Sequence, residues 1–277
     1  MGAMLAFGAS FYLWLCAPDA LRQALSARVS RIVLIASLVV LVSAIAWLAL
    51  EAASMADDWA AAADPDMIWA TLSDTGFGRA WMARLPLAAA LVVLVLARPG
   101  RWPAITLLAG LVLASLGLVG HAAMHAGLEG ALQRGNHAVH LLAAGAWLGS
   151  LAPFALSLPA ISDDRLGPDA ARALARFSVV GQFAVLAIVV TGIANVALIS
   201  GAAPIPPASP YSALLDAKLI LVAIMIGLAI VNRLCLAPRI QADGRALGML
   251  AATSCAEIVL GTCIVGLVSA FALLNPA

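Results

Sequence analysis

Charged residues are scarce in this 277-residue chain: Asp, Glu, Lys and Arg make up 10% of it, against 64% hydrophobic residues. A soluble domain normally carries about 25% charged and about 45–50% apolar residues, so the composition excludes an ordinary soluble protein. The mean hydropathy of +1.05 indicates a protein built for lipid. A formal net charge of +1 excludes the strongly basic surface that nucleic-acid binding requires, and we expect no nucleic-acid partner.

Several common motifs are absent as well. The four cysteines form no CxxC pair and no CxxCH haem-attachment motif. The sequence has no GxxxxGK[ST] loop, so any transport must be passive or ion-coupled rather than driven by ATP. The first residues lack a basic leading segment and a small-residue cleavage site, which favours a retained first span over a cleaved signal peptide. We expect a membrane protein that is not an enzyme unless it binds haem.

Long apolar segments fill the chain instead. Eight of them stand out, at about 2–17, 31–53, 79–97, 103–125, 135–158, 174–200, 212–236 and 247–273. A helix needs about 20 residues to cross a hydrocarbon core of about 30 Å, and segments without period-2 alternation are helices rather than barrel strands. The sequence predicts an all-α polytopic membrane protein with about eight transmembrane helices. These would form a single transmembrane domain over residues 1–277, with the lipid bilayer as its surroundings.

Basic residues are distributed unevenly between the connecting loops. Eleven of them fall in or beside loops one, three, five and seven: Arg22, Arg28, Arg31, Arg98, Arg101, Arg165, Arg172, Arg176, Arg233, Arg239 and Arg245. Four fall on the other side: Arg79, Arg84, Arg134 and Lys218. Because cytoplasmic loops are enriched in Lys and Arg, we expect the odd-numbered loops in the cytoplasm. Both termini then face the other side, which for a bacterial inner (plasma) membrane is the periplasm.

A weak internal similarity relates the two halves of the chain. FGRAWMAR near the start of the third predicted helix aligns with YSALLDAK near the start of the seventh, each an aromatic residue followed by a base seven residues later. WLCAP in the first helix echoes WLGSLAP in the fifth. The pattern fits two parallel four-helix repeats, 1–125 and 135–277, related by an axis along the membrane normal. Chance similarity between apolar helices with interfacial aromatics is the alternative.

All four histidines lie in one window, HAAMHAGLEGALQRGNHAVH, at residues 121–140. His121, Met124 and His125 share one helical face at i, i+3 and i+4. His137 and His140 share another at i and i+3, at the start of the fifth predicted helix. A short loop around EGALQRG makes the two helices antiparallel neighbours. We therefore expect the four imidazoles at one level, with His125 and His137 near the outer surface.

Clustered imidazoles with one thioether suit a transition metal. Imidazole binds copper, zinc, iron and nickel, and a thioether shifts the preference toward copper, above all Cu(I). The carboxylate nearest in sequence is Glu129 alone, which disfavours Mg²⁺ and Ca²⁺. The window therefore predicts a copper site facing the outer side. The alternatives are axial ligation of a haem b by paired histidines and ordinary hydrogen-bonded interfacial histidines.

Ionisable residues also lie inside the predicted spans, where charge is costly and indicates function. Arg84 lies beside Trp81, and Lys218 is its counterpart in the seventh helix. Each either reaches the interface or holds an inward-facing anion or the loop carboxylates. Glu257 lies about ten residues into the eighth helix, too deep to reach the surface. We expect it either as a hydrogen-bonded carboxyl or as part of an ion or proton path.

The cysteines allow an extension of that path. Cys255 and Cys263 lie eight residues apart on the eighth helix, and Cys16 and Cys235 lie near the cytoplasmic ends of the first and seventh. Soft thiolates on that side would suit inward movement of copper, but membrane cysteines are more often small apolar residues. Two amides are expected to form hydrogen bonds between helices: Asn195 and Asn232.

Five features follow one another along the chain: TGFGRAWMARL, GHAAMHAG, NHAVHLLAAGAWLGSLAPF, YSALLDAKLILVAIMIGLAIVNRLCLAPRI and the helix that contains Glu257. Together they resemble the copper resistance protein D family (CopD) of bacterial inner membranes. The resemblance covers about residue 70 to the end, while the first 60 residues match only as hydrophobic spans. It implies an eight-span inner-membrane protein of copper homeostasis that moves copper inward, often with a small periplasmic copper-binding protein as partner.

The resemblance also implies roles for individual residues. The family's histidines correspond here to four positions: His121, His125, His137 and His140. Its aromatic–base helix starts correspond to two pairs: Trp81 with Arg84, and Tyr211 with Lys218. Met124 has no counterpart that we can assign, so its role as a ligand depends on spacing alone.

The function expected from residues and resemblance together is copper homeostasis and resistance. The protein would bind copper at a periplasm-facing site of His and Met residues and transport it across the inner membrane toward the cytoplasm. Two alternatives stay open. One is a b-type haem-binding membrane oxidoreductase, and the other is a non-transporting copper sensor or scaffold for a periplasmic chaperone.

Overall fold

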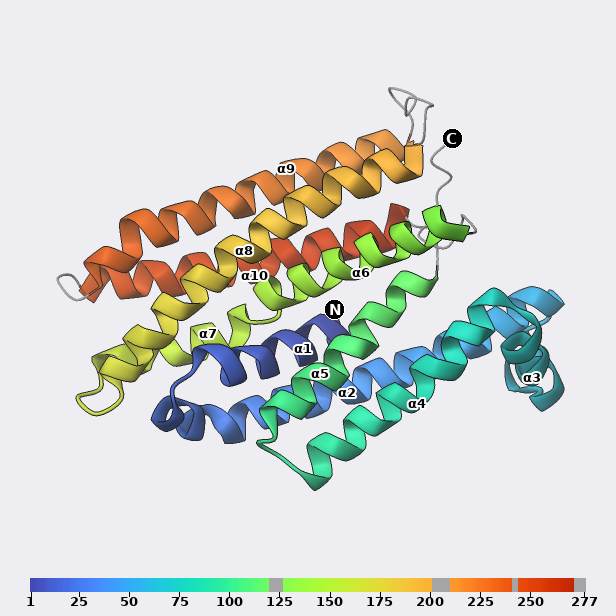
Figure 1. The fold of residues 1–277 in the computed structure, drawn as a ribbon, viewed down its shortest axis with the longest axis horizontal. Coiled ribbons are helices and arrows are strands. Elements are labelled where there is room, and N and C mark those ends of the chain that lie inside the picture. The colour runs from blue at the N-terminus through green and yellow to red at the C-terminus, as the bar shows by residue number, and fades with distance from the viewer. Residues whose placement is uncertain (120–126, 201–209, 241–243, 272–277) are drawn as a thin grey trace.

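The computed structural model describes residues 1–119, 127–200, 210–240 and 244–271, and every regular element in these ranges is helical (Figure 1). Within them, six helices are long and apolar enough to cross a membrane: Asp19–Ala56, Gly76–Ala97, Gly127–Ser162, Gly167–Leu198, Ser212–Arg239 and Gly244–Ser269. The other two predicted spans are shorter apolar helices, Gly2–Cys16 and Trp102–Leu118. The prediction of an all-α polytopic membrane protein is confirmed, whereas the possible repeats stay a prediction.

The N-terminal half is built, in chain order, from α1 (Gly2–Phe11), η1 (Tyr12–Cys16), α2 (Asp19–Ala56), η2 (Trp59–Ala63), α3 (Pro65–Asp74), α4 (Gly76–Ala97), α5 (Trp102–Ala114) and η3 (Ser115–Leu118). α2 begins at Asp19, whereas the sequence predicted a start at residue 31. The stretch taken for a loop is rich in Ala, Leu and Arg, which favour helix, and a carboxylate favours a helix N-terminus. The second predicted loop contains α3, which begins where the Asp64 side chain accepts a hydrogen bond from Asp66 N–H.

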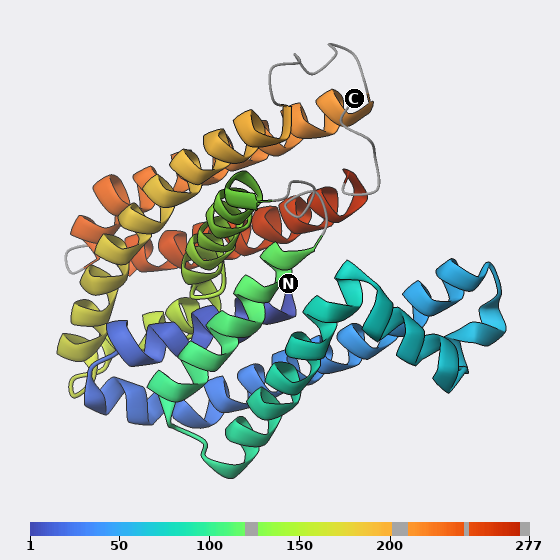
Figure 2. The same ribbon diagram turned by 45° about the vertical axis from the view of Figure 1, so that its right-hand side comes forward.

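The C-terminal half is built from α6 (Gly127–Leu148), α7 (Leu151–Ser157), η5 (Leu158–Ser162), α8 (Gly167–Ser200), α9 (Pro210–Val231), η6 (Asn232–Leu236), η7 (Ala237–Arg239) and α10 (Gly244–Phe271). α6 packs against α8, α1 and α5, while α10 packs against α9 and α7. In both views α8 and α9 lie on one side of the bundle and α2 and α4 on the other, with α1, α5, α6 and α10 between them (Figures 1 and 2).

The two halves meet where α1 crosses α6 at very short range. A Cβ added to Gly8 would lie less than 3.0 Å from backbone atoms of Gly145 and Gly149. Ser150 Oγ donates a hydrogen bond to the Gly8 carbonyl oxygen at 2.8 Å. Lipid provides no hydrophobic driving force between helices, so membrane helices associate through small residues that allow such close packing. The glycines therefore fix the position of α6 relative to the N-terminal half.

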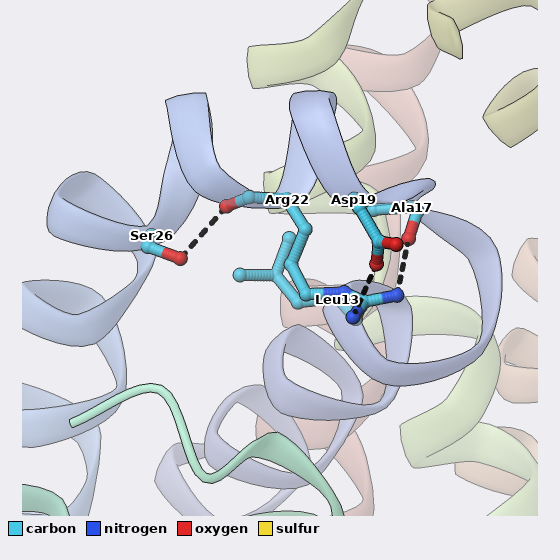
Figure 3. A network of polar contacts seen from close by, with 5 residues as sticks. All are labelled: Leu13, Ala17, Asp19, Arg22 and Ser26. Atoms are coloured by element: carbon cyan, nitrogen blue, oxygen red, sulfur yellow. Dashed lines mark hydrogen bonds and ion pairs between the residues drawn. The ribbon is translucent and has the colours of Figure 1, made fainter. Parts of the chain in front are cut away.

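Arg22 holds the turn between η1 and α2 (Figure 3). Its Nε donates to Leu13 O at 2.8 Å and its Nη2 donates to Ala17 O at 3.0 Å. Its Nη1 pairs with the Asp19 carboxylate at 2.9 Å, and Ser26 Oγ donates to Arg22 O at 2.7 Å. The last carbonyl groups of a helix have no partner within the helix. The Arg22 guanidinium donates to carbonyl groups in and just after η1 and so fixes the direction in which α2 leaves the turn.

Candidate functional site

The helix that carries His137 and His140 begins earlier than predicted. α6 starts at Gly127, not at residue 135, so the predicted loop EGALQRG is helical. Its glycines suggest a turn, but its Ala, Leu, Gln and Arg favour helix, and Glu129 in the first turn complements the helix dipole. His137 therefore does not begin a helix. It lies ten residues into α6 and His140 thirteen, about 15 and 20 Å along the axis at about 1.5 Å per residue.

The other ligands predicted for copper, His121, Met124 and His125, lie outside the described residues, as does the side chain of Tyr211. The helix expected over 103–125 ends earlier, at Leu118, because Val119 is extended with φ −133° and ψ 166°. A Cβ on Gly117 would lie 3.0 Å from Arg134 O and 3.5 Å from the Cβ of Ala138. η3 therefore lies directly against α6, at the residue next to His137.

The His140 imidazole is oriented by α8. Its Nδ1 lies 2.9 Å from Thr191 Oγ1. The Thr191 hydroxyl also donates to the Ala187 carbonyl oxygen one turn earlier, and it has a single proton to give. The threonine oxygen therefore accepts the hydrogen bond from Nδ1–H of His140. This tautomer leaves the lone pair on Nε2, as in histidines whose other nitrogen is fixed by a neighbouring acceptor when they bind a metal.

Asn136 extends this contact along α6. Its Nδ2 donates to Thr191 O and to Asn195 Oδ1, both at 2.9 Å. The expectation that Asn195 bonds between helices is confirmed. Polar groups one turn apart on α6 thus face polar groups one turn apart on α8, and the histidine side of α6 lies toward α8.

Lys218, on α9, contributes positive charge to the same region. It lies within electrostatic range of His137 and His140, and it has an interaction partner of its own. In the described part of the chain no three His, Cys, Asp or Glu side chains are close enough together to hold a metal ion. The described residues therefore supply two imidazoles, and a complete site would need ligands from elsewhere in the window.

Arg84 and Trp81 lie where α4 meets α5. Trp81 is fully buried, and its Nε1–H donates to Ala44 O on α2 at 2.8 Å. Arg84 is only 6% exposed, and its guanidinium carbon lies 5.5 Å from the centre of the Trp81 ring. Its Nη1 donates to Val112 O and to Ser115 Oγ, each at 2.7 Å. Arg84 thus neither reaches the interface nor pairs with a described carboxylate. It binds the end of α5 instead.

Glu257 belongs to a second polar cluster, on α10 and η6. Its side chain is buried, and its Oε1 accepts a hydrogen bond from Asn232 Nδ2 at 3.3 Å. Asn232 Oδ1 in turn accepts one from Thr253 Oγ1 at 2.6 Å. Glu257 is therefore joined to a neighbouring helix, as one of the two sequence expectations requires, and Asn232 is the interhelical amide that was expected.

The cysteines do not converge. Cys16 is buried, whereas Cys235, Cys255 and Cys263 are exposed on the outside of the bundle, and all four are free thiols. The exposure of Cys255 and Cys263 on an outer face of α10 agrees with a role as small apolar residues rather than as metal ligands.

The sequence analysis did not predict a role for three polar residues: Asn136, Thr191 and Thr253. A signal for the first two exists, because Asn136 and His140, like Thr191 and Asn195, are polar pairs at i and i+4 in otherwise apolar helices. Reading polar as well as ionisable residues at helical spacing would have found that face.

Known proteins resemble this chain along nearly its whole length. A family profile described as "Copper resistance protein D-like, N-terminal domain" matches residues 1–131, and one described as "Copper resistance protein D" matches residues 171–271. The chain is 34% identical over 278 residues to the "Inner membrane protein YebZ" of Escherichia coli, covering 99% of this chain and 94% of that protein. It is 33% identical over 205 residues to the "Copper resistance protein D" of Pseudomonas syringae pv. tomato, covering 69% of this chain and 63% of that protein. No solved structure matches it. The chain therefore belongs to the copper resistance protein D family.

Proposed function

We propose that the protein binds copper at a periplasm-facing site in the histidine window and transports it across a bacterial inner membrane toward the cytoplasm. The observation that carries the proposal is His140 on α6, whose Nδ1–H bonds to Thr191 and whose Nε2 lone pair is left for a metal. His137 lies one turn away on the same helix. Family membership supports copper as the ion, since one relative is named for copper resistance.

The start of the window can reach this pair. Gly117 lies against α6 at Ala138, and His121 follows it by four residues, which span at most about 14 Å. His125 precedes the first residue of α6 by two positions. Chain length thus allows His121 to reach the pair, whereas Gly127 lies about 15 Å along α6 from His137. With His125 and Met124 the proposed site would contain imidazoles and one thioether, a donor set that suits copper.

The orientation of the protein follows from its arginines. The η1–α2 and η5–α8 connections lie at one end of the bundle, at the left of Figure 1, together with the end of η7 and the start of α10. With the adjoining helix ends they carry nine of the 11 basic residues assigned to the cytoplasm. The positive-inside rule favours that end in the cytoplasm, and a relative named as an inner-membrane protein supports that membrane. Both termini and the copper site would then face the periplasm, where a small copper-binding protein would deliver the ion.

Metal analysis of purified full-length protein tests the site. We expect the variant with alanine at all four histidines to lose copper while it keeps its folded, monodisperse behaviour in detergent. Met124→Leu should weaken Cu(I) binding, whereas Met82→Leu, at an exposed position on α4, should leave it unchanged. Unchanged copper stoichiometry in a folded quadruple variant would refute the site.

The same preparation discriminates between the competing functions. A Soret band in protein purified without added metal would assign the paired histidines to haem b, and with it an oxidoreductase. Copper binding without copper uptake into proteoliposomes would favour a sensor or scaffold for a periplasmic chaperone. We expect neither result, and we propose no enzymatic activity.

A further inference from the structure

Glu257 is a buried carboxyl group that copper capture does not use. It is the fourteenth of the 28 residues of α10 and is only 3% exposed. Within the described ranges no lysine or arginine forms an ion pair with it, and its hydrogen bond goes to the neutral Asn232. A charged side chain at such a depth is costly and marks an ion or proton pathway by default.

Two hydrogen bonds join this carboxyl group to its neighbours. Thr253 Oγ1 bonds to Asn232 Oδ1 and also lies within donating distance of the Met249 and Leu250 carbonyl oxygens, while Asn232 Nδ2 donates to Glu257 Oε1. Oε1 therefore acts as an acceptor. Glu257 Oε2 receives no hydrogen bond from any described group, so it is the oxygen on which a proton can be held and released without breaking the cluster.

The helices around Glu257 are interrupted. Asn232 begins η6, a π-helical turn at the end of α9, and π-turns are frequent at functional sites. The α6–α7 helix breaks at Gly149 and Ser150. Gly261, one turn after Glu257, faces that break, because a Cβ there would lie less than 3.0 Å from the Leu148 side chain. Interrupted helices at mid-membrane typically line ion sites in transporters.

Glu257 also lies on the route inward from the histidines. Leu148 follows His140 by eight residues, about 12 Å along α6, and Glu257 precedes Gly261 by four residues, about 6 Å along α10. Because α6 and α10 run in opposite directions (Figure 1), the two distances add to about 18 Å. The carboxyl group is thus a second polar position, deeper in the same half of the bundle.

No other titratable group among the described residues forms a hydrogen bond or ion pair with Glu257. The elements that pack against α10, and α10 itself, carry these: Glu129, Arg134, His137, His140, Tyr211, Asp216, Lys218, Arg233, Cys235, Arg239, Arg245, Cys255 and Cys263, while α7 carries none. Arg233 is the nearest in sequence to Asn232, but its Nη1 donates to Ser178 O on α8 at 3.4 Å. Lys218 and the titratable residues of α6 lie toward the ends of α9 and α6 that are farther from Glu257.

We infer that Glu257 is a proton-binding site at which a proton is exchanged for copper in transit; the inference depends on the proposed copper transport. In a low-dielectric interior a carboxylate attracts a cation strongly and a neutral acid does not, so proton and copper exclude one another. One proton leaves the carboxyl group as the ion arrives and returns after it departs, and no bond to carbon and no oxidation state changes. Copper moving inward is then coupled to a proton moving outward, and the copper gradient drives this exchange without ATP.

Proteoliposomes that contain a pH-sensitive dye test this coupling. When Cu(I) is added outside vesicles of the wild-type protein, we expect copper uptake together with a rise in internal pH. Glu257→Gln keeps the shape of the side chain and its bond to Asn232 but cannot release a proton, so the pH rise should be lost. Glu257→Asp, which restores a carboxyl group, should recover part of it. Ser254→Ala is the matched control, because Ser254 is fully buried on the same helix and bonds only to Leu250 O.

The results separate the two proposals. Wild-type protein that binds and takes up copper while internal pH stays constant overturns the proton inference alone. If the Glu257→Gln variant folds and still shows the rise in internal pH that the wild type shows, the proton inference is overturned as well. Wild-type protein that binds no copper at all overturns the proposed function, and the inference with it. Folding of each variant is checked by its elution from a sizing column and by its thermal unfolding.

Discussion

Replacing Gly8 by alanine tests the close crossing of α1 and α6. The new Cβ would lie less than 3.0 Å from backbone atoms of Gly145 and Gly149, whereas ordinary contact begins at 3.4 Å. The atoms it meets belong to the backbone, so no side chain can rotate out of the way. The two helices must therefore separate, by a distance on the order of 1 Å.

The expected loss of stability combines three effects. Forcing an extra methyl group into a close-packed interface costs about 1–3 kcal/mol. Separation also lengthens the Ser150–Gly8 hydrogen bond, now 2.8 Å, and such a bond between membrane helices contributes about 0.6 kcal/mol. In the other direction, alanine favours the helix over glycine by about 0.5–1 kcal/mol. We expect the free energy of unfolding to fall by about 0.6–3 kcal/mol.

Denaturant-induced unfolding of the purified protein in detergent micelles measures this difference. Gly227→Ala on α9 is the control, because nothing lies within 4 Å of a Cβ at that position. The control should be slightly more stable than the wild type, through helix propensity alone. If Gly8→Ala proves as stable as Gly227→Ala, the helices do not cross as closely as described and the reasoning is refuted.

Two further substitutions test the polar contacts. Thr191→Val removes the acceptor of the His140 Nδ1–H group and should weaken copper binding by about 10–100-fold, measured by competition with a chelator. Thr106→Val, at a buried hydroxyl that has no hydrogen-bond partner among the described residues, should leave the affinity unchanged. Arg22→Ala removes the donors that hold the first turn and should lower the free energy of unfolding by about 1–3 kcal/mol. Arg31→Ala, whose Nε bonds only to its own helix, should have little effect, and equal losses in both variants would contradict the role of Arg22.

The spans of this protein could be predicted because their length and apolar character are properties of local sequence. Their ends could not. Asp19 and Gly127 begin helices inside stretches that contain Ala, Leu, Gln and Arg, which suit an exposed helix as well as a loop. The added helical turns in α6 change the position of His137 from the first residue of a helix to its interior, so an error in one boundary altered the predicted geometry of the site.

The candidate residues were found by type, but their partners were not. Glu257 stands out because it is acidic and deep, yet its bond to Asn232 joins residues 25 positions apart and depends on how η6 packs against α10. The contact between His140 and Thr191 spans 51 positions. Arg84 was expected to reach the interface or an anion, but its guanidinium donates to Val112 O at the end of α5. Its neighbour Trp81 is bonded to α2. Such pairings depend on tertiary packing, which the spacing of residues along one helix does not reveal.

The π-helical turn of η6 has a consequence for how relatives of this protein are compared. An α-helix rotates by about 100° per residue, and a π-turn accommodates one residue more than the α-helical winding does. Deleting one residue within 232–236 would therefore restore regular α-helical winding, with the helix before Asn232 and the end at Pro238 keeping nearly their present orientation. A one-residue gap at this place in an alignment is for that reason a local loss of the turn beside Glu257, and the residues on either side of it stay comparable with their equivalents.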